Sequence, residues 1–340
     1  MRKIAWLTTI SLLVLAAAFA QSGYHQIKKI SIPGDGFWDY LTTDPGTGRV
    51  FVSHGTEVDV VDAAKGEVVG KIAGLKLVHG IALVTEFNRG FISDGAANQV
   101  VIFDMKTLEK TGAVAAGTNP DGIIYDPASK RVFAFNGRSA NATAVDAEKG
   151  TLAGTVMLEG KPEFPAPDGK GHVFVNIEDK SEVMDIDAKA LTVSHKWPLA
   201  PCEEPSGMAM DTKTRRIYSG CDNKMMAVMD ADSGKVVTTV PIGAGVDATW
   251  FDPGTKTVFN SCGQDGVLTV IHEDSPDKYT VVENAPTEKG ARTMAVDTKT
   301  HKVYLSVAQV EFQPPAEGDG KGRPRRRVIP GSFGLLEFGR

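Results

Sequence analysis

Carboxylate and imidazole side chains recur in this sequence about every forty residues, a spacing that suits a ligand site assembled from distant segments. One recurring position lies five residues before a turn and is occupied by Asp39, Gly80, Asp121, Glu163, Ser206, Asp247 and Arg292. Trp38 and His79 adjoin it, and His54 lies three residues after a repeated aromatic residue. Carboxylate oxygens and imidazole nitrogens are common ligands of divalent metal ions. The set is therefore a candidate cation site, provided that the fold brings its members together.

Two interpretations of this set stay open. Asp, Asn and Ser are favoured at turns and strand starts because their side chains hydrogen-bond to the backbone, so a ring of acids can arise without a ligand. Alternatively, the residues line one acidic funnel, where a bound cation would relieve repulsion among the carboxylates. The predicted ligand-binding residues are Trp38, Asp39, His79, Asp121, Glu163, Asp247 and Arg292. The predicted ligands of a divalent metal ion are Asp39, His54, His79, Asp121 and Asp247.

Local motifs for catalysis are missing from the sequence. It contains no GxSxG, no HExxH and no CxxC pair, and the glycines near its end lack the flanking strand and helix of a phosphate-binding loop. A non-catalytic protein that binds a small ligand, a metal ion or a partner protein is therefore favoured. An enzyme of the lyase or dehydrogenase type, with a metal or cofactor in the funnel, stays as the alternative because distant segments can form a site.

An internal repeat describes the elements that must position these residues. An aromatic residue returns every 40 to 45 positions, at Phe51, Phe91, Phe133, Phe174, Tyr218, Phe259 and Tyr304. A turn precedes most copies, as at Asp252-Pro253-Gly254, and a second turn follows each of the first five, as in VVDAAKGEVV. The intervening segments are short and rich in Val, Ile, Thr and aromatic residues, which is typical of strands. Seven units of four strands predict one all-β domain over residues 21–340, a seven-bladed β-propeller, which we expect to be monomeric.

The seventh unit runs out of chain after three strands. Its segments lie near 294–296, 303–307 and 333–338, so a fourth strand must come from elsewhere. Residues 25–32 have the character of the fourth strand that precedes each blade. We therefore expect the N-terminal strand to close blade seven, which would remove an exposed sheet edge.

The segments FVSH, FISD and FAFN, together with PDGIIYDP and VDAAKG, resemble the repeats of the YVTN-repeat β-propellers. The chain is most similar to the exported YncE-like members, over residues 24–340. The resemblance implies a propeller scaffold and no particular activity, since that family is defined by its fold.

The three cysteines fall in neighbouring units. Cys202 lies just before the first strand of unit five and Cys221 ends its second strand, so an antiparallel hairpin would bring them to one face. A disulfide there would suit an oxidising compartment, and Cys262 would be left over. Three buried free thiols are the alternative.

The first twenty residues have the pattern of a secretory signal peptide. Arg2 and Lys3 precede an apolar run, and Ala18-Phe19-Ala20 is a typical cleavage site. Removal of residues 1–20 would change the formal net charge from −5 to −7. We expect an acidic protein of the periplasm or the extracellular space, without a transmembrane segment.

A basic insertion interrupts unit seven at about residues 312–330. It contains Pro and Gly together with Lys321, Arg323, Arg325, Arg326 and Arg327, which predicts a flexible loop. A solvated surface loop is the simplest interpretation. The alternative is a docking site for an anionic partner such as nucleic acid or lipid, although the loop lacks interleaved aromatic residues for base stacking and the net charge opposes attraction.

Overall fold

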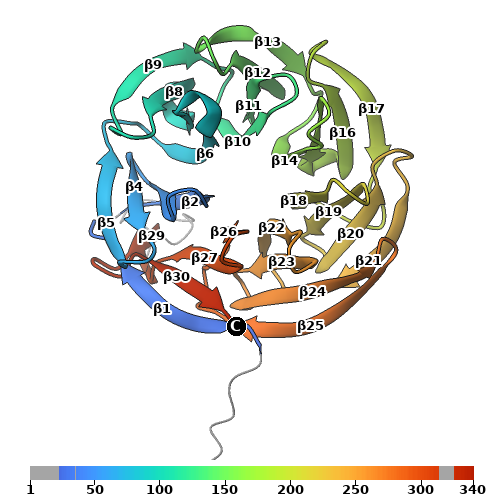
Figure 1. Ribbon diagram of the computed structural model, residues 1–340. Coiled ribbons are helices and arrows are strands. Elements are labelled where there is room, and N and C mark those ends of the chain that lie inside the picture. Colours follow the sequence, from blue (N-terminus) through green and yellow to red (C-terminus); the bar gives the residue numbers. More distant parts are fainter. Residues whose placement is uncertain (1–22, 35, 314–324) are drawn as a thin grey trace, which may run out of the picture.

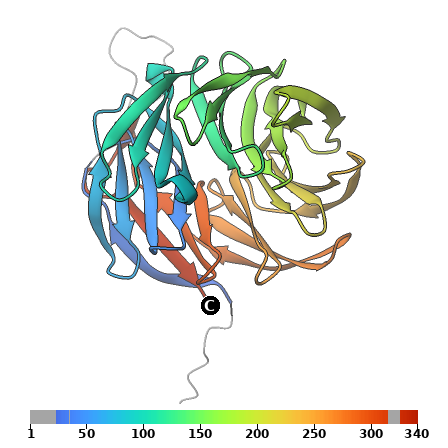
Figure 2. The ribbon, with the colours of Figure 1, turned by 45° about the horizontal axis from the view of Figure 1, so that its top comes forward.

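Seven four-stranded antiparallel sheets stand around a central axis (Figure 1). The computed structural model describes residues 23–34, 36–313 and 325–340. Sequence order follows the sheets around the ring, and the tilted view in Figure 2 shows that each sheet is twisted. No helix of the described residues is long and apolar enough to cross a membrane. The predicted seven-bladed β-propeller is confirmed.

The first six blades each consist of four consecutive strands, ordered from the axis outward. Blade one contains β2 (Trp38–Asp44), β3 (Arg49–His54), β4 (Glu57–Asp62) and β5 (Glu67–Ile72); blade two contains β6 (Val78–Val84), β7 (Arg89–Asp94), β8 (Gln99–Asp104) and β9 (Lys110–Ala115). Blade three contains β10 (Pro120–Asp126), β11 (Arg131–Asn136), β12 (Asn141–Asp146) and β13 (Thr151–Met157); blade four contains β14 (Pro162–Pro167), β15 (His172–Ile177), β16 (Glu182–Asp187) and β17 (Thr192–Pro198). Blade five contains β18 (Pro205–Asp211), β19 (Arg216–Cys221), β20 (Met225–Asp230) and β21 (Val236–Pro241); blade six contains β22 (Val246–Asp252), β23 (Thr257–Cys262), β24 (Val267–Ser275) and β25 (Lys278–Pro286). Three one-turn 3-10 helices occupy turns: η1 (Thr85–Phe87), η2 (Gly95–Ala97) and η3 (Glu178–Lys180).

Blade seven joins the two ends of the chain. Its order is β26 (Met294–Asp297), β27 (Lys302–Val307), β30 (Gly334–Gly339) and β1 (His25–Ser31). Strand β1 pairs antiparallel with β30, from His25 opposite Gly339 to Ser31 opposite Gly334. Ile30 and the following Ile32 are buried, which anchors the strand to the core. The predicted closure of blade seven by the N-terminal strand is confirmed.

The repeated aromatic residue forms the contacts between blades. It lies in the second strand of every blade and is at most 2% exposed. In one example, the rings of Phe51 in blade one and Phe103 in blade two lie 5.9 Å apart. Burial of each such side chain stabilises the fold by roughly 1.5–3 kcal/mol. The repeated aromatic residues therefore reflect the packing that holds neighbouring blades together.

The insertion in blade seven differs from the predicted loop at both of its ends. Val310–Gln313 forms β28 and Arg325–Val328 forms β29, and these two strands pair antiparallel. The hairpin forms because Val310 and Val328 lie opposite each other and pack on a hydrophobic cluster shared by blades seven and one. Arg325, Arg326 and Arg327 therefore belong to a strand, and Arg327 forms an ion pair with Glu311 at 3.5 Å. Lys321 and Arg323 lie outside the described residues.

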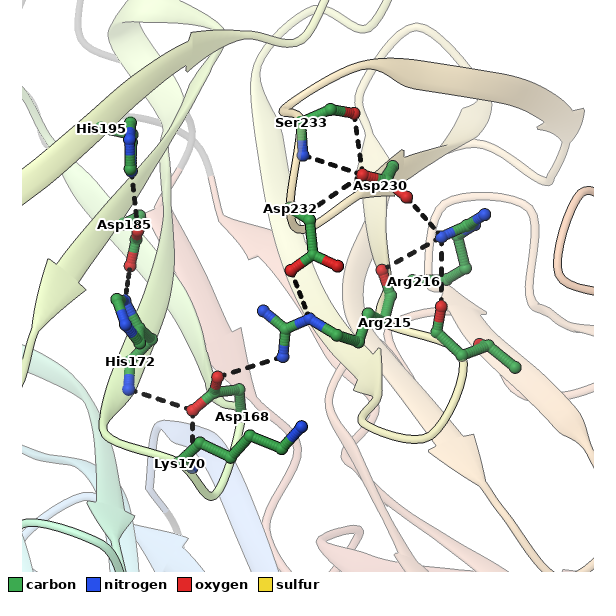
Figure 3. Close-up of polar contacts among 11 residues, drawn as sticks. Asp168, Lys170, His172, Asp185, His195, Arg215, Arg216, Asp230, Asp232 and Ser233 are labelled. Carbon is green, nitrogen blue, oxygen red and sulfur yellow. Dashed lines mark hydrogen bonds and ion pairs between the residues drawn. The ribbon is translucent and has the colours of Figure 1, made fainter.

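Polar contacts link blades four and five at the end opposite the starts of the inner strands (Figure 3). Arg215, in the turn before β19, donates to Asp168 of blade four at 3.1 Å and to Asp232 at 2.5 Å. Within blade four, the buried carboxylate of Asp185 accepts hydrogen bonds from His172 at 2.7 Å and His195 at 3.0 Å. Two half-exposed imidazoles in blade four therefore share one buried carboxylate, that of Asp185.

Candidate functional site

The predicted acidic residues lie at one end of the axis, at the starts of the inner strands. Asp39, His79, Asp121, Glu163 and Asp247 are each the second residue of their strand, and Arg292 precedes β26. In all five of these strands the pairing register shifts at this position, which is where a β-bulge redirects side chains. We call these six residues the ionic ring.

Hydroxyl groups of the second strands support the redirected backbone. The Asp39 N–H donates to Ser53 Oγ at 2.8 Å, and the Gly80 N–H donates to Ser93 Oγ at 2.7 Å. Ser93 Oγ in turn donates to the Asp121 carbonyl of the next blade at 2.5 Å. The polar groups freed by the bulges are thus satisfied, and adjoining blades are held in register at the ring.

Opposite charges alternate along much of the ionic ring. His79 Nδ1 lies 2.7 Å from Asp39 Oδ2 and 3.7 Å from Asp121 Oδ1. Arg292 forms an ion pair with Asp247 and a longer one, of 3.4 Å, with Asp39. Burial alone would lower the pKa of both cations, but the pKa of each is raised because the neighbouring carboxylates outweigh burial. The predicted acidic funnel is therefore partly neutralised by its own His79 and Arg292.

Burial raises the pKa values of three carboxyl groups of the ring, Asp121, Glu163 and Asp247. Burial, followed by the charge of Asp39, raises the pKa of Asp121 to about 6. Burial, followed by the charge of Asp121, raises the pKa of Glu163 to about 8, although Lys161 lies 2.6 Å from the Glu163 carboxylate and opposes this shift. Burial also raises the pKa of Asp247, against the effect of Arg292. Asp121 and Glu163 thus lack the positive charge that would fully compensate for their burial.

Three ring residues could hold a metal ion together. One ligand atom each from Asp39, His79 and Asp121 lies within 4.8 Å of the others. Because His79 Nδ1 is hydrogen-bonded to Asp39, a metal ion bound there would have to replace a proton. Asp247 does not belong to this group, since its side chain pairs with Arg292 and with Ser206 Oγ at 3.1 Å.

His54 and Trp38 do not lie with the ring carboxylates as predicted. His54 Nδ1 bonds Asp59 at 2.7 Å, and its ring packs 4.4 Å from that of Phe333 in blade seven. The indole of Trp38 is buried 6.0 Å from the same ring, and only its carbonyl accepts from Arg292, at 3.3 Å. For His54 the reason is that β3 is one strand farther from the axis than β2, so a side chain at its end turns toward blade seven. Trp38 begins β2 itself, and its indole packs toward Phe333 of blade seven.

An aromatic cavity below the ionic ring was not predicted from the sequence. The cavity has a volume of about 380 Å³ and is lined by the inner strands of blades one to six. At its ring end, Tyr40 of blade one meets Phe164 of blade four with an edge-to-face geometry, 4.4 Å between ring centroids. Each directly follows a ring carboxylate, Asp39 or Glu163. The spacing of acidic and basic residues does not reveal this cavity because none of its lining residues is charged.

The cysteines are arranged as one pair and one free thiol. Cys202 and Cys221 form a disulfide with their Cα atoms 5.6 Å apart. Cys262 is a buried free thiol, and burial raises its pKa to about 11. Neither group belongs to the ionic ring.

Comparison with known proteins was informative only for structure. No protein-family model matches the chain, and no sequence among the curated proteins matches it. A Kuenenia stuttgartiensis hydrazine synthase structure is similar with a TM-score of 0.70 and 14% identity, over 84% of this chain and 95% of that one. The U3-55K structure has a TM-score of 0.77 and 8% identity over 92% and 99% of the two chains, and a chain of a mitotic checkpoint complex has 0.73 and 14% over 97% and 99%. At these identities the similarity establishes the β-propeller fold and nothing finer.

Proposed function

We propose that this chain is an exported, non-catalytic propeller that binds a small cation at the ionic ring. The observation that carries the proposal is the pair of under-compensated carboxyl groups, Asp121 and Glu163, on adjacent inner strands. A bound cation would supply the positive charge that burial of these groups demands. Export is supported by the signal-peptide pattern of residues 1–20, and the repeat motifs support membership of the YncE-like YVTN-repeat propellers.

Cation binding at this position would compete with protons. A carboxyl group that is partly protonated near neutral pH must lose its proton before it can pair with a cation. Divalent ions have a further option, since Asp39, His79 and Asp121 can each offer one ligand atom. The cation is therefore either a metal ion at these three residues or a compact ammonium group near Asp121.

Titration calorimetry tests the proposal directly. We would titrate the processed protein with calcium, manganese and zinc chlorides and with methylammonium chloride. Binding of at least one cation is expected, and Asp121→Asn should weaken it about tenfold or more because the variant removes a charge from a buried site. Asp222→Asn is the matched control, because Asp222 is an exposed carboxylate in the turn after β19, off the axis at the same end. If no cation binds, or if both variants behave alike, the ring residues have only a structural role.

An enzyme is the second candidate function. Carboxyl groups with pKa values of about 6 and about 8 lie in the range of general acids and bases at neutral pH. A lyase or dehydrogenase of this kind would use a metal or cofactor in the funnel. Elemental analysis and the absorption spectrum of protein purified from its native compartment test this candidate, since the enzyme requires a stoichiometric metal or cofactor. Protein that carries neither would contradict the enzyme and leave reversible cation binding.

A further inference from the structure

The cavity below the ionic ring is lined by aromatic residues from several blades. Tyr40 comes from blade one, Phe164 from blade four and Trp250 from blade six. Apolar side chains such as Ile81 and Met208 and the threonines Thr42 and Thr43 complete the walls, and no lining residue carries a formal charge. The volume of about 380 Å³ falls in the range of small-ligand pockets. The cavity could therefore hold a compact organic molecule.

The cavity lies within the electric field of the ring. Burial, followed by the charges of Asp121, Glu163, Asp39 and Asp247, raises the pKa of the Tyr40 hydroxyl well above its usual value. The negative charge of these carboxylates therefore favours a positive charge at the ring end of the cavity. Among the described residues, none hydrogen-bonds to the Tyr40 hydroxyl, which leaves a polar group at that end for a ligand.

These two features together select one class of ligand. A divalent metal ion prefers carboxylate and imidazole ligands, and no residue that lines the cavity offers one. An anion is repelled by the carboxylates at the ring end. A neutral apolar molecule would fit the walls but would gain nothing from the field. A weakly hydrated organic cation gains from both, because aromatic faces and nearby carboxylates each attract a positive charge.

We propose that the cavity binds a quaternary or alkylated ammonium ion, with its charged group at the ring end beside Tyr40 and Phe164 and its apolar body along the inner strands, where Trp250 lines the cavity. The inference rests on the proposed function, since it names the ligand whose charge the ionic ring attracts. It adds that the aromatic cavity, and not the ring alone, provides part of the affinity.

A pair of isosteres tests the role of charge. Choline and 3,3-dimethyl-1-butanol have nearly the same shape, and only choline is charged. Titration of the unmodified protein should show choline binding about 5- to 30-fold more tightly, the range expected for a cation–π contact. Equal affinity for the two compounds, or no binding of choline, would overturn the inference without any variant having to fold.

Two variants then separate this inference from the proposed function. Phe164→Leu keeps an apolar wall but removes an aromatic face, so it should weaken choline about fivefold or more and leave methylammonium binding at the ring unchanged. Phe87→Leu is the control, because Phe87 lies in η1, at the end of blade two opposite the ionic ring, and does not line the cavity. If Asp121→Asn weakens both cations while Phe164→Leu weakens neither, the ring site stands and the cavity site is wrong. If Asp121→Asn changes neither, the proposed function fails.

Discussion

Removal of the disulfide between Cys202 and Cys221 should lower the stability of the fold by about 3 kcal/mol. The bridge joins residues that are 19 positions apart. Closing a loop of that length removes about 11 cal/mol/K of entropy from the unfolded chain, which corresponds to about 3 kcal/mol at 25 °C. With an unfolding entropy of about 2.1 cal/mol/K per residue over roughly 300 residues, the midpoint of thermal unfolding should fall by about 5 °C.

The assay is thermal unfolding of the double variant Cys202→Ala/Cys221→Ala, followed by circular dichroism. Cys262→Ala provides a matched control because Cys262 ends the second strand of the next blade and is as fully buried as Cys221. It measures what loss of a buried sulfur alone does to stability, without a bridge. A double variant that melts no lower than the control would refute the reasoning, as would three titratable thiols, instead of one, in denatured and unreduced protein.

Three further predictions concern the closure of the ring and its titratable groups. Deletion of residues 21–32 should leave the outer edge of β30 unpaired and yield little folded monomer in size-exclusion chromatography; a deleted protein with an unchanged melting midpoint would contradict the closure. Cation binding should be about tenfold weaker at pH 5 than at pH 7, because Asp121 with a pKa of about 6 is mostly protonated at the lower pH, and Asp121→Asn should remove this dependence. Burial alone would lower the pKa of His172, but the hydrogen bond to Asp185 outweighs burial and the pKa is raised. The contribution of His172 to stability is therefore present below about pH 6.5 and is lost as the pH rises through its folded-state pKa. His172→Ala should therefore reduce the free energy of unfolding in urea more at pH 5.5 than at pH 8, and an equal loss at both values would show that the imidazole acts only by packing.

The repeat carried enough information to predict most of the architecture. A buried aromatic residue such as Phe133 is required once per blade, so its period reports the number of blades. The same register placed Asp39, Asp121 and Asp247 at one end of the axis, because every inner strand starts there. Counting strands in the last unit predicted the pairing of the two chain ends. Each of these features can be predicted from a single repeat or from two repeats that adjoin in the sequence.

Contacts across the ring could not be predicted in the same way. Tyr40 and Phe164 come from blades that are three units apart, and nothing in either repeat identifies the other as its partner. The contact of His54 with Phe333 of blade seven was not predicted, because the register gives the end of a strand but not its distance from the axis. Arg292 was found by register, but its pairing with Asp247 depends on side-chain direction, which spacing does not contain.

The pairing of β1 with β30 also determines the order in which the molecule can be completed. Synthesis proceeds from the N-terminus, so β1 is made before the other strands of the propeller but has no partner until β30 has been made. Throughout that time Ile30 and Ile32 lack their native burial, and an early segment with an unpaired edge is a target for chaperones and a risk for misassociation. Because β1 and β30 are neighbours, the C-terminal end can be joined to residue 23 and the chain opened at a turn between two blades. In the resulting circular permutant, all four strands of blade seven would lie in one continuous stretch of sequence. Such a permutant should refold faster than the natural chain, because its final sheet would form from local contacts.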